Sequence, residues 1–177
     1  ISKELIAKYS AEKCYQKLLA WAVENSMENV EYLKKDKEYV IKVLNIDREK
    51  DKPRKDIYKW VMFFDYYDYM FSAPKTYQID ESERKKFEEV LRAYKNYIDL
   101  SDKTIWFDKI KEMSKNLGYA VDNKEYKKSP DAFKGNVAKV CEFIRVAVTG
   151  QKNSPDLFEI MSVLGKEKVL ERISLIV

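Results

Sequence analysis

The chain has 177 residues, of which 45% are hydrophobic and 36% charged, and its formal net charge is +4. This length and apolar content exclude a disordered chain and can bury the core of one domain or two small ones. Only four glycines and four prolines are present, so few residues favour the turns that strands require. We therefore predict an all-α fold, a compact bundle of about seven or eight helices. The modest positive charge permits contact with a polyanion without indicating one.

Cysteine and histidine usage gives no sign of a metal site. The two cysteines, Cys14 and Cys141, are far apart and histidine is absent, so the usual zinc-ligand spacing is missing. No run of about eighteen apolar residues could span a membrane, and the first residues, ISKEL, lack the apolar region of a signal peptide. We predict a reduced, cytoplasmic protein with no membrane partner. Because the chain begins at Ile1 rather than Met, we expect it to be a piece of a longer protein.

Helical spacing of apolar residues predicts three helices in the first part of the chain. Ser10 should cap a helix that continues to about Asn25, and a patchier helix should follow over residues 30–44. The charged segment around residues 45–56 is expected to be a loop. The aromatic stretch of residues 56–71, DIYKWVMFFDYYDYMF, then predicts a third helix. Most of its rings recur at core spacing, so we interpret them as core rather than as a base-stacking platform.

Further helices are predicted from capping residues in the second part of the chain. An Asp-x-x-Glu sequence at Asp80 opens one helix, Gly118 ends the next, and the pairs Ser129-Pro130 and Ser154-Pro155 open two more. The predicted helices cover residues 80–98, 102–117, 130–150 and 155–165, and the last begins at about residue 166.

No catalytic motif is visible. Without histidine the chain lacks the commonest general base and every Ser-His or Cys-His nucleophile pair. Its four glycines are isolated, so no phosphate-binding loop is present, and carboxylate pairs such as Glu88-Glu89 are typical of a solvated helix surface. We do not expect this chain to be catalytic by itself.

Arg145 lies in an otherwise apolar stretch, FIRVAVTG, and two interpretations remain open. It could be a surface arginine paired with Glu142, near a helix C-terminus where a cation is favoured, and periodicity alone favours this interpretation. Alternatively, Arg145 could face the start of the next helix, with Ser154 as N-cap, Pro155 in the first helical position and Leu157 behind them. Such a notch could hold an unstacked base, since a guanidinium can stack on a base or bond its edge.

The stretch over residues 129–173 contains FIRVAVTG, then SPDLFEIMSVLGKEKVLERI, and it resembles the C-terminal end of bacterial glutamyl-tRNA synthetases. That family has an arginine before A-L-T-G, then S/T-P, then a helix that ends in L-G-K-E-R. Upstream, PRKDIYKW resembles the start of an earlier helix of the family, whereas residues 1–52 match loosely. The resemblance implies the helical anticodon-binding cage of a class I synthetase, here with one subdomain over residues 1–98 and a second over residues 99–177.

The resemblance also implies roles for individual residues. Arg145 and Leu157 would enclose the first anticodon base, and Ser154 and Pro155 would read the second. Arg54 would read the third base, a cytosine in glutamate tRNAs, whose adjacent acceptors suit a guanidinium, whereas the guanine of glutamine tRNAs presents donors.

The implied partner is the anticodon loop of tRNA(Glu), bound by a monomer. The parent protein would be a glutamate–tRNA ligase that uses ATP with Mg, whereas this fragment would hold no cofactor and would lack the catalytic domain. The segment KEMSKN at residues 111–116 resembles the K-M-S-K-S loop of that class, but we interpret Met113 as part of a helical apolar stripe. A helical protein-interaction module without RNA binding remains the alternative, and a steep salt dependence of RNA binding would distinguish the two.

Overall fold

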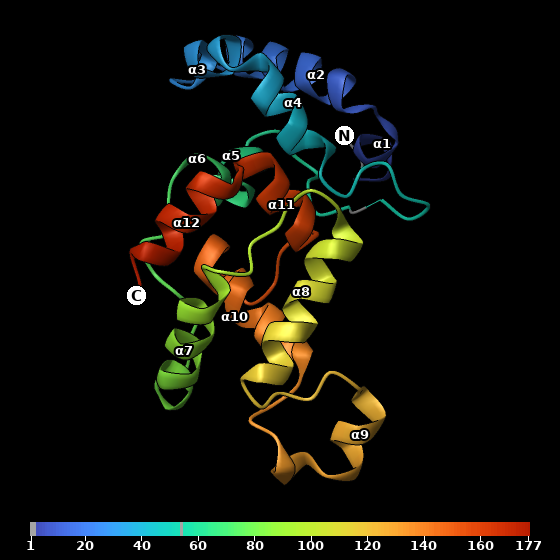
Figure 1. The fold of residues 1–177 in the computed structure, drawn as a ribbon. Coiled ribbons are helices and arrows are strands. Elements are labelled where there is room, and N and C mark those ends of the chain that lie inside the picture. The colour runs from blue at the N-terminus through green and yellow to red at the C-terminus, as the bar shows by residue number, and fades with distance from the viewer. Residues whose placement is uncertain (1–2, 54) are drawn as a thin grey trace. The chain divides into compact units, whose positions relative to one another are not determined.

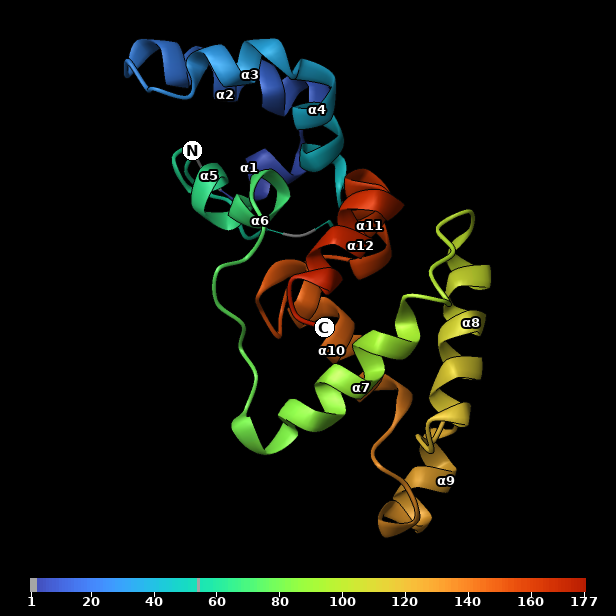
Figure 2. The ribbon, with the colours of Figure 1, turned by 60° about the vertical axis from the view of Figure 1, so that its left-hand side comes forward.

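A computed structural model describes residues 3–53 and 55–177 (Figures 1 and 2). Over those residues it contains twelve α-helices, two 3-10 helices and no strand, apart from one isolated bridge between Ala120 and Asn136. The all-α prediction is confirmed. The helices outnumber the predicted seven or eight because two expected helices are each divided into two, and because two short helices, Lys3–Lys8 and Asn123–Lys128, form where none was predicted. None of the described helices is long and apolar enough to cross a membrane.

The residues divide into two units, Ile1–Phe71 and Ser72–Val177, each with its own contacts. The division after Phe71 lies at a different place from the predicted subdomain boundary after residue 98. That functional boundary stays a prediction.

The first unit contains six helices. Ser10 caps α2 as predicted, because its side chain accepts a hydrogen bond from the Lys13 backbone N (3.2 Å). The helix predicted over residues 30–44 is instead two helices, since Asp36 leaves helical geometry with φ −110° and ψ 40°. The six are α1 (Lys3–Lys8), α2 (Ala11–Glu24), α3 (Val30–Lys35), α4 (Lys37–Asn45), α5 (Met62–Tyr66) and α6 (Asp68–Phe71).

The aromatic stretch forms α5 and α6 rather than the single helix predicted. Tyr67, between them, has φ −110° and ψ 20°. Phe63, Tyr67 and Tyr69 are all at least 95% buried. One continuous helix would place Tyr67 and Tyr69 on nearly opposite sides, so the interruption allows both rings to be buried. The interpretation of these aromatics as core holds for Trp60, Phe63, Tyr67 and Tyr69. Tyr58 is 47% exposed, and the other rings, Phe64, Tyr66 and Phe71, are half-buried.

The second unit is built around α10, which packs against α7, α8 and α12. Tyr94 of α7 is fully buried; its hydroxyl accepts a hydrogen bond from Trp106 Nε1 (2.9 Å) and donates to Met161 Sδ (3.6 Å), which joins three helices. The elements are η1 (Glu81–Glu83), α7 (Arg84–Tyr94), α8 (Lys103–Asn116), α9 (Asn123–Lys128), η2 (Pro130–Ala132), α10 (Val137–Thr149), α11 (Leu157–Leu164) and α12 (Lys166–Ser174).

Two of the predicted helix starts in this unit precede only a 3-10 turn. Asp80 precedes a 3-10 turn, so α7 begins at Arg84. Ser129-Pro130 also opens only a 3-10 turn, and α10 begins at Val137. The late start of α10 has its reason in a backbone pairing: Ala120 N donates to Gly135 O (3.0 Å) and Val137 N donates to Ala120 O (2.8 Å). This pairing holds the chain before α10 in an extended form.

Candidate nucleic-acid interface

The candidate site lies where α10 ends and α11 begins. Gly150 ends α10 with φ 78°, a left-handed conformation that favours glycine. A Cβ at this position would lie 2.7 Å from the Thr76 carbonyl oxygen, so glycine is required for the close approach as well. Thr149, 3% exposed, donates a hydrogen bond to the Arg145 carbonyl (2.8 Å). The Thr149-Gly150 pair therefore sets the direction in which the chain leaves α10.

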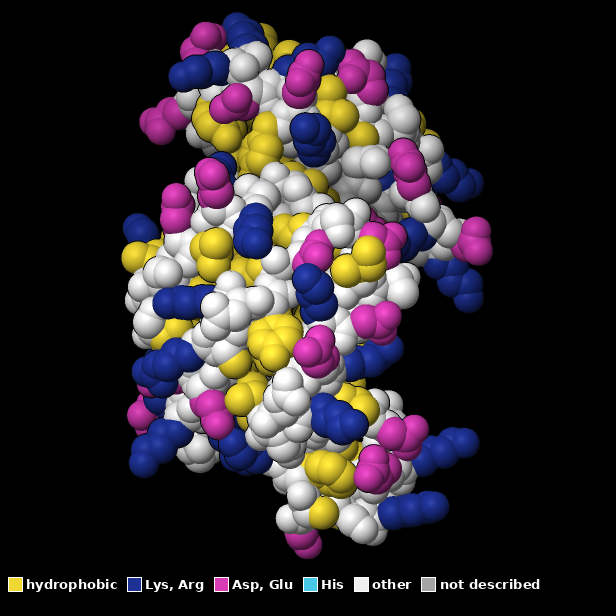
Figure 3. Space-filling model, viewed as in Figure 1, with side chains coloured by type: hydrophobic (Ala, Val, Ile, Leu, Met, Phe, Trp, Pro, Cys, Tyr) yellow, Lys and Arg dark blue, Asp and Glu magenta, His cyan; other side chains and the backbone are white. Residues whose placement is uncertain are grey.

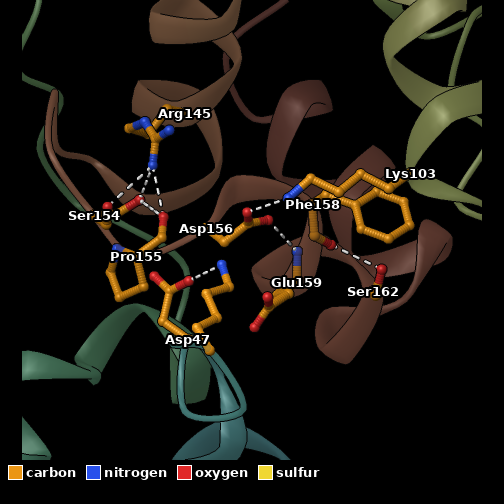
Figure 4. A network of polar contacts seen from close by, with 10 residues as sticks. Asp47, Lys103, Arg145, Ser154, Pro155, Asp156, Phe158, Glu159 and Ser162 are labelled. Carbon is orange, nitrogen blue, oxygen red and sulfur yellow. Dashed lines mark hydrogen bonds and ion pairs between the residues drawn. The ribbon is translucent and has the colours of Figure 1, made fainter. Parts of the chain in front are cut away.

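Arg145 points from α10 into the loop that precedes α11 (Figure 4). Its Nη1 donates to the carbonyl oxygens of Ser154 (3.3 Å) and Pro155 (2.8 Å) and to Ser154 Oγ. We predicted from the sequence that Arg145, Ser154 and Pro155 lie around one notch, and in the structure they are in direct contact.

The interpretation of Arg145 as the surface partner of Glu142 is wrong. Lys139 donates to Glu142 Oε1 at 2.8 Å, and among the described residues no ion pair joins Arg145 to Glu142. A lysine one turn earlier on α10 thus takes the carboxylate, and the guanidinium turns toward carbonyl acceptors instead.

The start of α11 also differs from its prediction. Asp156, not Ser154, is the N-cap: Asp156 Oδ1 accepts from the backbone N of Glu159 (3.1 Å), and the first helical residue is Leu157 rather than Pro155. Lys103, at the start of α8, forms an ion pair with the same carboxylate. Sequence reasoning missed Lys103 and Asp156, although the spacing of Asp156 and Glu159 is that of a capping box.

Burial separates the predicted contact residues into two groups. Pro155 is buried and Leu157 is only 3% exposed, whereas Arg145 and Ser154 are half-buried. Arg145 and Ser154 are therefore accessible from outside, while Leu157 supports the loop from within. The assignment of bases to these residues stays a prediction.

Cys141 lies one turn before Arg145 on α10. Burial raises the pKa of its thiol to about 11, and the positive charge of Arg145 opposes this rise only in part. The thiol is therefore neutral at physiological pH, which makes it a packing residue beside the site rather than a nucleophile.

Arg54, the residue predicted to read the third base, lies outside the described residues. Within the described part of the first unit, Tyr66 donates to Asp56 Oδ2 (2.8 Å). Arg48 donates from Nε to the Leu44 carbonyl (2.6 Å) and from Nη1 to the carbonyls of Ile6 (2.9 Å) and Tyr9 (3.0 Å).

Met113, in the segment that resembles a nucleotide loop, is 1% exposed within α8. The interpretation of this segment as part of a helix with an apolar stripe is confirmed.

The helical fold agrees with a match to a family of known proteins. A family model described as "Anticodon binding domain" matches residues 11–177. This match covers nearly the whole chain, and the chain belongs to that family of anticodon-binding domains.

The similar proteins are glutamate–tRNA ligases. The one from Acetivibrio thermocellus is 42% identical over 182 residues, covering 98% of this chain and 32% of that protein. The one from Clostridium perfringens (strain 13) is 37% identical over 186 residues, covering 98% of this chain and 33% of that protein. The chain thus spans about a third of the length of the curated relatives it matches.

A crystal structure of a glutamate tRNA ligase from Elizabethkingia meningosepticum, in complex with its amino acid, has the same fold over 99% of this chain and 30% of that chain. Its TM-score is 0.60 and its sequence is 18% identical.

Proposed function

We propose that this chain is the anticodon-binding part of a glutamate–tRNA ligase and that it binds the anticodon loop of tRNA(Glu) as a monomer. The contact of Arg145 with Ser154 and Pro155 carries this proposal. Three residues that the resemblance assigns to the first two anticodon bases form one hydrogen-bonded group. The proposal includes a longer, cytoplasmic parent protein whose other part joins glutamate to tRNA with ATP and Mg.

Arg145 has donors left for a base. All its hydrogen bonds among the described residues use Nη1, so Nε and Nη2 remain for a base edge or phosphate, and the guanidinium plane can stack on a base. Ser154 is half-buried and adds a hydroxyl at the same place. Because Leu157 is 3% exposed, we expect it to contact a base only if the loop shifts on binding.

The first test removes Arg145. Arg145→Ala should raise the Kd for a stem-loop RNA carrying the tRNA(Glu) anticodon by about tenfold, because one charge-assisted contact to the RNA is lost. Fluorescence anisotropy with a labelled stem-loop measures this change. The matched control is Arg92→Ala, which removes the same charge from an exposed ion pair with Glu88 on α7 and should change the Kd less than about twofold. Equal effects of the two substitutions would contradict a specific role for Arg145.

The second test concerns Arg54. Arg54→Gln should reduce discrimination between stem-loops with cytosine and guanine at the third anticodon position by roughly 1–3 kcal/mol, since the guanidinium fork is lost. The ratio of the two Kd values is the measurement, and Lys55→Gln at the next position is the control for lost charge. An unchanged ratio in Arg54→Gln would refute the assignment.

A further inference from the structure

Arg172 of α12 is a charged residue that is only 5% exposed. Its Nη1 donates to the Val148 carbonyl oxygen at 2.6 Å. Val148 lies in the last turn of α10, three residues after Arg145. Carbonyls in the last turn of a helix lack an intrahelical donor, and a cation there also interacts favourably with the helix dipole. Arg172 therefore caps the helix that carries Arg145.

The second arm of the same guanidinium reaches another segment. Arg172 Nη2 donates to the Ser72 carbonyl oxygen at 3.2 Å, at the start of segment 72–78, which contains no helix. At the other end of this segment, Gln78 holds the loop that follows α10: its backbone N donates to the Gly150 carbonyl (2.9 Å), and its Oε1 accepts from the Lys152 backbone N (2.9 Å). One buried arginine thus joins the end of α10 to the segment that supports the loop.

We propose that Arg172 is a positioning residue for RNA recognition. It holds the last turn of α10 and the loop over residues 150–155, so that Arg145 and Ser154 keep the geometry in which they contact RNA. This inference rests on the proposed function. Arg172 is too buried to touch RNA, so its whole effect on binding passes through Arg145 and the loop.

The chemistry of the guanidinium explains why arginine is suited to this position. Its planar fork can donate to two carbonyls that belong to different segments, whereas a lysine ammonium is a single point charge. Methionine would fill similar space without any donor. Arg172→Lys should therefore keep part of the function, and Arg172→Met should lose it.

A double-mutant cycle on the 177-residue chain tests the inference, with the stem-loop of tRNA(Glu) as the RNA. Arg172→Met should raise the Kd by about tenfold in the wild-type background and less than about twofold in the Arg145→Ala background, because the two residues act as one unit. Arg172→Lys should give an intermediate loss with the same dependence on Arg145, and it decides the outcome if Arg172→Met does not fold. Equal losses in both backgrounds, or no loss, would overturn the inference.

Amide hydrogen exchange without RNA provides the second readout. The Gly150 amide, which donates to Val146 O at 2.7 Å, should exchange faster in Arg172→Met. The Gln78 amide, which donates to Gly150 O, should also exchange faster. The Gly118 amide at the end of α8, which donates to Lys115 O at 3.1 Å, is the control and should not change. Unchanged exchange at Gly150 would overturn the inference whatever the RNA result.

The two proposals can fail separately. RNA binding by the wild-type chain without coupling between Arg172 and Arg145 overturns only the role of Arg172. No anticodon-dependent binding by the wild-type chain overturns the proposed function and, with it, the role of Arg172 in recognition.

Discussion

At the scale of single residues, surroundings decide what a given amino acid does. Gly118 and Gly150 both have a positive φ, of 84° and 78°. A Cβ on Gly118 would meet no atom within 4 Å, whereas a Cβ on Gly150 would meet Thr76 O at 2.7 Å and Pro74 Cβ at 3.1 Å. Both glycines relieve backbone strain, and only Gly150 also permits a close backbone contact beside the candidate site.

These two glycines form a matched pair for a stability measurement. Gly118→Ala should lower the free energy of unfolding by about 1 kcal/mol, the cost of a left-handed conformation for a residue with a side chain. Gly150→Ala should cost at least about 2 kcal/mol more, because Thr76 or α10 must also move. Urea denaturation of both variants measures the difference. Equal losses of unfolding free energy in the two variants would mean that the segment around Thr76 moves aside without an energetic cost.

At the scale of elements, the start of α11 depends on one carboxylate that serves both as a helix cap and in an ion pair. Asp156 caps the helix through the Glu159 backbone N (3.1 Å) and also forms an ion pair with Lys103. The side chain of Asp156 is 15% exposed and that of Lys103 is 55% exposed, so the ion pair is mostly solvent-screened. We therefore attribute most of the stabilisation to the cap.

Substitutions at Asp156 separate these two contributions. Asp156→Ala should lower the free energy of unfolding by about 1–2 kcal/mol, because an N-cap acceptor is lost. Asp156→Asn keeps an acceptor and loses only the charge, so its cost should stay below about 1 kcal/mol. Thermal or urea unfolding gives both values. If the asparagine variant were as unstable as the alanine variant, the ion pair with Lys103 would be the larger contribution.

At the scale of the whole molecule, the charge is modest and mixed. The net charge is +4, and on the face in Figure 3 basic and acidic side chains are interspersed rather than gathered into one field. Several lysines are also paired, among them Lys134 with Glu89 (2.7 Å) and Lys139 with Glu83 (3.2 Å). We therefore expect few phosphate contacts and a large share of the affinity from the loop bases.

Salt dependence measures that balance. For roughly three phosphate contacts, raising the salt from about 50 to about 200 mM should weaken stem-loop binding by about 20- to 40-fold, through counterion release. A stem-loop with a scrambled anticodon should bind more weakly. Its log Kd should change with log salt concentration at a similar slope, because the phosphates are the same. A chain that binds neither RNA under low salt would instead fit the protein-interaction module.

Local signals predicted those elements whose ends are set by neighbouring residues. Ser10 and Gly118 act as the cap and stop that their positions indicate, because each interaction spans only a few residues. The predictions at Ser154 and Ser129 were wrong, because a second possible cap or a distant backbone pairing competes there. The helix is interrupted at Tyr67 because the rings of Tyr67 and Tyr69 are both buried in the core. The periodicity of one continuous helix cannot predict such an interruption.

The sequence by itself determined the helical class, most of the core and the residues of the candidate notch, because these follow from composition, periodicity and motif. Only the tertiary structure decided the partners of Arg145, the burial of Leu157 and the contacts of Arg172. Arg172 lies 100 positions from Ser72 and 24 from Val148. Contacts across such separations depend on how helices pack, and helix packing is a property of the whole folded unit rather than of any local stretch.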